Sequence, residues 1–172
     1  LSVERLDFQG NPNIGVYSLS TEAHVLVHLG LPAKTKKVME RILGVRAIEA
    51  SICATTLLGI FIAGNSNALI VPYLASDDEI DFLQNSLGVK VSRLETNLTA
   101  LGNIILANDH GAIVHAKLRE NTIKSIESIL GVKVARGKIG GTGLVGSSAV
   151  GCISLEVSKV PIDRAAPVYV VY

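Results

Sequence analysis

The sequence predicts an α/β fold built from repeated units of about 44 residues. Glycine follows an aliphatic residue at four places whose spacings are 44, 43 and 44: Gly15, Gly59, Gly102 and Gly146. The tripeptide Leu-Gly-Val recurs at 43–45, 87–89 and 130–132. Residues 99–115 also repeat residues 56–72, with seven of the seventeen places identical. Because these markers share one period, one structural unit recurs along the chain.

Each unit opens with two short β-rich runs. In the second unit these are "GIFIAGN" (59–65) and "ALIVP" (68–72), and "NIILANDHGAIVH" (103–115) repeats the pattern. Asn and Gly between two apolar runs favour a hairpin. We therefore expect Ile60 and Asn103 at the start of a strand. Tight-turn conformation explains the repeated Asn65 and Asn108 without a ligand.

A helix follows the hairpin. In "SDDEIDFLQNSLG" (76–88), Ser76 can cap the first turn with Glu79, and Gly88 closes the last turn. One face of this helix is apolar, and the third unit repeats that face 43 residues later: Ile80, Leu83 and Leu87, then Ile123, Ile126 and Leu130. A last strand, "VKVSRLE" (89–95) or "VKVARGK" (132–138), completes the unit.

A ββαβ unit of this size has too little core to fold alone, so neighbouring units must bury surface against each other. Period and composition allow an open solenoid or a closed ring. A ring leaves fewer exposed sheet edges.

Composition narrows the class of protein. With 48% hydrophobic residues the 172-residue chain can bury a core in one domain, and the formal charge is +1. Three Phe, four Tyr and no Trp provide no row of rings for stacking bases, which argues against direct binding of single-stranded nucleic acid. The basic run Lys34, Lys36 and Lys37 is typical of a solvated helix start.

The cysteines and the apolar runs indicate an intracellular protein. Cys53 and Cys152 stand 99 positions apart without a CxxC motif, as expected for two reduced thiols packed as small apolar residues. No apolar run reaches the roughly 18 residues that span a membrane, and the first residues do not form a signal peptide. We expect a soluble cytoplasmic protein without a metal or cofactor.

The residues from about Arg5 to Val150 resemble the translation initiation factor 6 family, the archaeal and eukaryotic ribosome anti-association factors. The resemblance rests on these segments in this order: "RLDFQGNPNIGVY" (5–17), "LLGIFIAGNSNALIVP" (57–72), "DDEIDFLQNSL" (77–87), "TALGNIILANDHGAIVH" (99–115) and "LVGSSAV" (144–150). It implies a pentein, a five-bladed ring of ββαβ repeats with helices outside and a narrow central channel. Residues 1–172 would then form a single domain, with repeats at about 11–54, 55–98 and 99–142 and an incomplete repeat at 143–172.

The resemblance also implies a function. Family members bind the large ribosomal subunit on its intersubunit side, mainly through a ribosomal protein, and prevent association with the small subunit. We therefore expect a steric binding protein and not an enzyme, with the large ribosomal subunit as its partner. An rRNA contact is a further expectation, and the free protein is expected to be a monomer without a membrane partner.

The family's ribosomal contact includes the loop and first-strand start of successive blades. In this sequence that places the ribosome-binding residues at Thr56, Ile60, Asn103 and Ser148. Asn103 is the strongest candidate because it replaces Ile60 at offset 43 while the neighbouring Gly102 is kept. A polar residue at an exposed strand end is the structural alternative.

The C-terminal part departs from the repeat. Five units would require about 220 residues, and "GCI" (151–153) fits the "GAI" of 111–113 only if four residues are absent before it. About twelve more would be absent between Ile153 and Ser158. Either this end is truly degenerate, or segments are missing from the sequence. We expect the second, with Cα separations at these places far above the 3.8 Å of a peptide link; "APVYVVY" (166–172) would then belong to a fifth blade.

An enzyme is the alternative, because penteins include enzymes that modify guanidino groups with a Cys nucleophile, a His and acidic residues. The candidates would be Cys53 or Cys152 with one of four histidines: His24, His28, His110 and His115. Cys53 is expected just before a strand and His110 in a hairpin turn, so we predict structural or surface roles for these residues. "GKIGGTGLVG" (137–146) lacks the GK[ST] ending of a phosphate loop and is predicted to be an inter-blade linker. A pentein-like scaffold with another partner is the third hypothesis.

Overall fold

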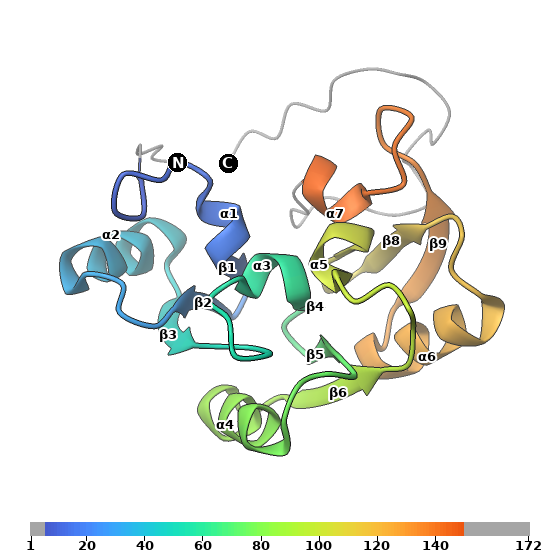
Figure 1. Cartoon of the computed structure of the whole chain (residues 1–172), viewed down its shortest axis with the longest axis horizontal. Helices are drawn as coiled ribbons and strands as arrows, with labels where there is room; N and C mark the ends of the chain where they lie inside the picture. Colours follow the sequence, from blue (N-terminus) through green and yellow to red (C-terminus); the bar gives the residue numbers. More distant parts are fainter. Residues whose placement is uncertain (1–5, 150–172) are drawn as a thin grey trace.

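The computed structural model describes residues 6–149, in which three small sheets follow one another in chain order (Figure 1). The first unit contains α1 (Ile14–Tyr17), β1 (Ser18–Ser20), β2 (His24–His28), α2 (Ala33–Leu43) and β3 (Arg46–Ala50). The second contains α3 (Leu58–Phe61), β4 (Ala63–Gly64), β5 (Ala68–Pro72), α4 (Asp77–Leu87) and β6 (Lys90–Leu94). The third contains α5 (Leu101–Ile104), β7 (Ile105–Ala107), β8 (Gly111–His115), α6 (Glu120–Leu130) and β9 (Lys133–Gly137), and α7 (Val145–Ser148) follows it.

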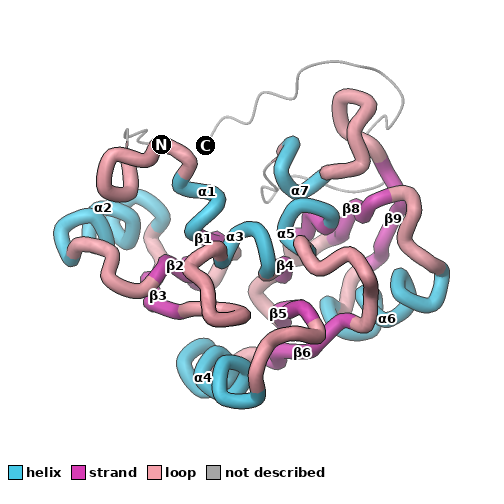
Figure 2. Tube along the Cα trace, viewed as in Figure 1, coloured by secondary structure: helices cyan, strands magenta, loops and turns pink. Residues whose placement is uncertain are grey.

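Each sheet has the same topology. The first strand pairs antiparallel with the middle strand, and the third strand pairs parallel with it after a crossover through the long helix. Figure 2 shows the three helices α2, α4 and α6 on the outside of the arc that the sheets form. The predicted order of strand, strand, helix and strand is therefore present in all three units.

The predicted start of the first strand is wrong. Residues 58–61 and 101–104 form short helical turns, and the strands begin only at Ala63 and Ile105. The N–H of Ile62 donates to the carbonyl oxygen of Leu58 at 2.9 Å, which is the i to i+4 bond of an α-helix. A four-residue apolar run does not distinguish such a turn from a strand. Ile60 and Asn103 consequently lie within helical turns.

The long helices begin and end as predicted. The hydroxyl of Ser76 accepts from the N–H of Glu79, and the carboxylate of Glu79 accepts from the N–H of Ser76, which together form a capping box. Gly88 and Gly131 end α4 and α6 in the left-handed conformation, with φ of 70° and 69°. The helix α2 begins at Ala33, next to the predicted basic run, where Lys36 pairs with Glu49 at 3.1 Å.

A repeated side chain joins each long helix to the last strand of its unit. Glu40, Gln84 and Glu127 occupy equivalent helical positions and accept hydrogen bonds from backbone N–H groups of the strands at 3.0, 3.3 and 3.1 Å. These bonds satisfy backbone donors on the outer strands. The sequence analysis did not identify this contact.

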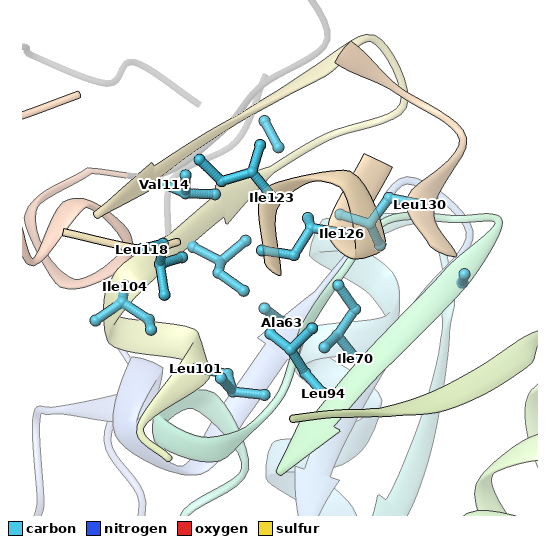
Figure 3. Packing of buried hydrophobic residues seen from close by; sticks show 13 residues of the cluster. Ala63, Ile70, Leu94, Leu101, Ile104, Val114, Leu118, Ile123, Ile126 and Leu130 are labelled. Atoms are coloured by element: carbon cyan, nitrogen blue, oxygen red, sulfur yellow. The ribbon is translucent and has the colours of Figure 1, made fainter. Parts of the chain in front are cut away.

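The core lies between neighbouring units. Ile123, Ile126 and Leu130 of α6 pack on Ile70 and Leu94 of the second sheet (Figure 3). On the other face of β5, Leu69 and Val71 pack with residues of the first sheet, as the twofold alternation of a strand requires. Because β5 is buried on both faces, each unit completes the core of the one before it.

No helix within residues 6–149 has the length and apolar content needed to cross a bilayer. The predicted breaks at Val150–Gly151 and between Ile153 and Ser158 lie outside the described residues, as does Cys152.

Candidate functional site

The four repeated glycines bring the short helical turns into contact. A methyl group added at Gly59, Gly102 or Gly146 would overlap the carbonyl oxygen of the glycine in the preceding turn, which is Gly15, Gly59 or Gly102. Only a residue without a side chain permits this approach of two backbones. The turns α1, α3, α5 and α7 therefore lie side by side along one arc (Figure 1). Gly15 begins this arc, with no described atom within 4 Å of a methyl group added there.

These turns and the linkers between units lie at one end of the strands. Because β4 is antiparallel to β5 and β6 is parallel to it, α3 and the segments that follow β5 and β6 meet at the same end. We call this end the turn face, formed by α1, α3, α5 and α7 with the linkers 51–57, 95–100 and 138–144. The opposite end carries the hairpin turns and is called the hairpin face.

The structure places all four predicted binding residues on the turn face. Thr56 is exposed just before α3, Ile60 is half-buried within α3, and Asn103 is half-buried within α5. Ser148 is exposed at the end of α7, where its hydroxyl donates to the carbonyl oxygen of Leu144 at 2.8 Å. The glycine contacts thus bring Ile60, Asn103 and Ser148 to three adjacent turns.

The register of the repeat distinguishes Ser148 from its neighbour Ser147. Asn103 follows Gly102 directly, and in α7 the residue that follows Gly146 is Ser147. Ser147, not Ser148, is therefore the equivalent of Asn103 and Ile60. The two serines are both exposed and both donate to the carbonyl oxygen of Leu144.

Asn103 has the features of a side chain available to a partner. Its backbone N–H donates to Ala100 at 3.1 Å, but its amide group forms no hydrogen bond with any residue in 6–149. Helix propensity does not explain an asparagine in this turn, because Asn ranks below most residues.

The centre of the turn face carries no charge. The segments 11–17, 52–61, 96–104 and 139–148 contain no Asp, Glu, Lys, Arg or His. Their polar groups are the hydroxyls of Ser and Thr, the Tyr17 hydroxyl, and the amides of Asn. Exposed charges lie beside these segments, at Glu95 and Lys138 in the linkers and at Lys117 after β8, and the hairpin face carries exposed Glu22, Arg46, Lys90 and Lys133.

Three of the four linkers share one tight turn. Bridges join Phe8 to Asn11, Ile52 to Thr55 and Ile139 to Thr142, and the two residues inside each bridge have positive φ. The predicted linker at 137–146 is confirmed for residues 138–144, whereas Gly137 ends β9 and Val145 and Gly146 belong to α7. The linker before Asn103 is the exception, since residues 95–100 form no such bridge and Thr96 Oγ1 accepts from the N–H of Leu98 at 3.3 Å.

Cys53 lies inside one of these turns, and α3 separates it from the next strand, so its predicted place just before a strand is wrong. Burial raises the pKa of the Cys53 thiol, and the negative charge of Glu79 raises it further. A cysteine nucleophile needs its thiolate, which this environment disfavours. Burial also raises the pKa of Glu79, but hydrogen bonds from the N–H groups of Ala54, Ser76 and Cys53 outweigh this effect and lower it.

The histidines form their contacts with residues other than Cys53. His28 packs edge-on against Phe8 and Tyr17, with ring centroids 5.3 and 5.8 Å away. His110 is exposed in a hairpin turn, as predicted, and His115 Nδ1 accepts from Lys117 N–H at 3.1 Å. Within residues 6–149 no hydrogen bond joins a histidine to Cys53, and no group of His, Cys, Asp and Glu side chains could hold a metal ion.

His24 is buried at the hairpin face, which the sequence analysis did not anticipate. Its Nε2 atom has no hydrogen-bond partner among the described residues, and the same holds for Ser66 Oγ. Burial lowers the pKa of His24, and the nearby charge of Asp109 opposes this shift in part.

Asn65 and Asp109 join the second unit to the third at the same face. The Asn65 amide donates to the carbonyl oxygens of Asn108 and Leu130 at 3.3 and 3.0 Å, and Asp109 accepts from Ser66 N–H at 2.7 Å. Asn65 also accepts within its own turn, as predicted. Its second role, between units, was missed because turn geometry alone explained the residue.

Comparison with known proteins agrees with this architecture of repeated units. The family model described as the eIF-6 family matches residues 3–154. The chain is 40% identical over 105 residues to "Translation initiation factor 6" of Thermococcus onnurineus (58% of this chain, 46% of the relative). The protein of that name from Pyrococcus furiosus is also 40% identical over 105 residues (58% and 46%). The protein of that name from Saccharolobus islandicus is 40% identical over 101 residues (58% and 45%).

The matched segments span about half the length of these relatives. The family model, in contrast, extends over most of the chain, including the three units and all four helical turns of the arc. The chain therefore belongs to the eIF-6 family.

Proposed function

We propose that this protein is a translation factor that binds the large ribosomal subunit through its turn face and prevents joining of the small subunit. Membership of the eIF-6 family and the name shared by its relatives support this proposal. The observation that carries it is Asn103, an unpaired amide in a turn that the glycine contacts hold in an uncharged face.

The proposed mechanism is steric. Thr56, Ile60, Asn103 and Ser148 contact a ribosomal protein on the intersubunit side, and the bound factor occupies the surface that the small subunit needs. This mechanism makes and breaks no covalent bond, so it requires no cofactor. The rigid arc of turns holds the contact residues in place before binding, which reduces the entropy lost on association.

We also propose that residues 1–172 belong to a single pentein domain, in which five units close into a ring. The helices α4 and α6 each cover the sheet of the unit before them, and each glycine turn after the first packs on its predecessor. The open surface at Gly15 is the place that a fifth turn would occupy. A crystal structure tests this proposal: a turn packed on Gly15 supports the ring, and solvent at Gly15 contradicts it.

Sedimentation with separated ribosomal subunits tests the function. We expect the protein on the large subunit alone, with less joining when small subunits are added. Asn103→Ala should weaken binding about tenfold, which corresponds to about 1.4 kcal/mol. Asn67→Ala, at an exposed asparagine of the hairpin face, is the matched control and should bind as the wild type does. Failure of the wild-type protein to sediment with large subunits would contradict the proposal.

A further inference from the structure

Exposed apolar side chains gather at the turn face. Residues 6–149 contain seven large hydrophobic side chains that are exposed: Leu29, Leu43, Tyr73, Leu74, Phe82, Leu98 and Leu144. Two of them, Leu43 and Phe82, lie on the outer helices α2 and α4. Leu98 and Leu144 lie in the linkers of the turn face, and the other three follow β2 or β5 at the same end of the strands. Interface cores combine such side chains with a scarcity of charge.

Leu98 and Leu144 lie closest in the chain to the candidate contact turns. Leu98 precedes α5, which carries Asn103, and Leu144 immediately precedes α7. Their exposed fractions are 40% and 46%. Since Gly146 of α7 packs on Gly102 of α5, the two leucines flank a pair of contacting turns.

The repeat shows that Leu98 is not needed for the fold. The equivalent places in the neighbouring linkers are Thr55 and Thr142. The hydroxyls of these threonines accept the N–H of the residue two positions later, at 3.2 and 3.1 Å. Leucine cannot accept this bond, and it leaves an apolar side chain in water. In the linker 95–100 the Thr96 hydroxyl instead accepts from the N–H of Leu98 at 3.3 Å, so this turn does not use the Leu98 side chain, and a binding role would account for it.

The absence of charge indicates the chemistry of the partner. Binding to RNA phosphates uses Lys and Arg and is strongly salt-dependent. The central segments of the turn face contain neither residue, and the exposed Lys117 and Lys138 at this end of the strands lie outside those segments. A turn face of Leu, Thr, Asn and Ser matches an uncharged protein surface.

We propose that Leu98 and Leu144 are the apolar anchors by which the turn face binds a protein of the large ribosomal subunit. This inference rests on the proposed function. The two leucines bury their side chains against the ribosomal protein, and Asn103 forms hydrogen bonds between them. The contact is then mainly apolar, and its affinity depends little on salt.

Quantitative binding of purified large subunits tests the inference. Leu98→Ser and Leu144→Ser should each weaken binding at least about tenfold, as expected for anchors that bury their side chains. Leu43→Ser and Phe82→Ser remove equally exposed apolar side chains from the outer helices and should bind as the wild type does. Wild-type affinity should change less than about threefold between 50 and 200 mM salt, where several phosphate contacts would cost about 1000-fold or more.

The variant Leu98→Thr distinguishes an effect on binding affinity from an effect on stability. It exchanges an exposed leucine for the residue that two other linkers hold at this place, so its thermal midpoint should match that of the wild type while its affinity falls. If wild-type protein binds and the Leu98 and Leu144 variants match the controls, this inference is wrong and the proposed function stands. A steep salt dependence would assign the contact to rRNA and also overturn it. If the wild type does not bind large subunits, both proposals fail.

Discussion

The backbone of Gly102 lies on the carbonyl oxygen of Gly59, so a methyl group at Gly102 would overlap that oxygen and come within 2.8 Å of the carbonyl oxygen of Ile62. Both obstacles are backbone atoms of a buried junction between units, and neither can move by a change of rotamer. The repeated glycine is therefore a packing requirement of the arc.

Gly102→Ala should lower the free energy of unfolding by about 3 kcal/mol or more, because overpacking against backbone forces the units apart. The control is Thr56→Ala, at an exposed residue just before α3, which should change the free energy of unfolding by less than about 0.5 kcal/mol. Urea unfolding of both variants measures the difference, and equal losses would contradict the packing explanation.

Asn65→Ala should cost about 2–4 kcal/mol, because it leaves the carbonyl oxygens of Asn108 and Leu130 without the Asn65 amide. Asn65→Asp keeps the acceptor for the turn but removes both donations, so it should cost nearly as much. Asn67→Ala, two residues later and exposed, should change the unfolding free energy by less than about 0.5 kcal/mol. A mild effect of Asn65→Asp would show that the turn, and not the link between units, determines this residue.

Ala54→Gly should stabilise the protein by about 1 kcal/mol. Ala54 has φ of 55°, a left-handed conformation that costs an L-residue about 1–2 kcal/mol, while the equivalent places hold Gly10 and Gly141. Ala23→Gly is the control at an exposed alanine without positive φ, and it should be neutral or destabilising. Thermal unfolding compares the two, and a loss of stability in Ala54→Gly would contradict the assignment of strain.

The stability of the protein should fall in acid through His24. Burial holds the pKa of His24 below its ordinary value of 6.5, so the folded state binds fewer protons than the unfolded state. This contribution is fully present above pH 6.5 and is lost as the pH falls from there toward the folded pKa, with a slope of at most about 1.4 kcal/mol per pH unit. His24→Gln should remove this component from the profile of unfolding free energy against pH.

Asn67→Ala is the control for that experiment, because Asn67 is exposed in a hairpin turn and carries no titratable group. It should keep the wild-type profile. Identical profiles for His24→Gln and wild type would mean that protonation of His24 does not limit acid stability.

The sequence predicted the features that act within one unit. Ser76, Glu79 and Gly88 define a helix through local capping rules, and Leu83 and Ile126 appear at helical spacing because the helices need an apolar face. The helical turns at 58–61 and 101–104 were missed because four residues are too few to show a period. The repeated Leu-Gly pair showed that these two segments are equivalent, but it did not show that they are helical.

Features that join units were harder to predict. The repeated glycines marked the period, but only the structure shows that each lies on the one before it. Glu40, Gln84 and Glu127 could have been found, because a carbonyl-bearing side chain recurs there at the repeat spacing. Nothing in the sequence indicates that His24 is buried or that Leu98 is exposed, since both depend on how units meet. The candidate site was implied by the resemblance to the family, and the departure of Asn103 from the repeat only made that residue the strongest candidate.

The dependence of each sheet on the next helix has a consequence for synthesis on the ribosome. When β5 leaves the exit tunnel, the face that carries Ile70 has no cover until α6, about one repeat later, has also emerged. At about 5–20 residues per second, a repeat of about 44 residues takes about 2–9 s. During that interval the nascent chain exposes an apolar sheet, so each unit is a transient target for chaperones until its successor is translated.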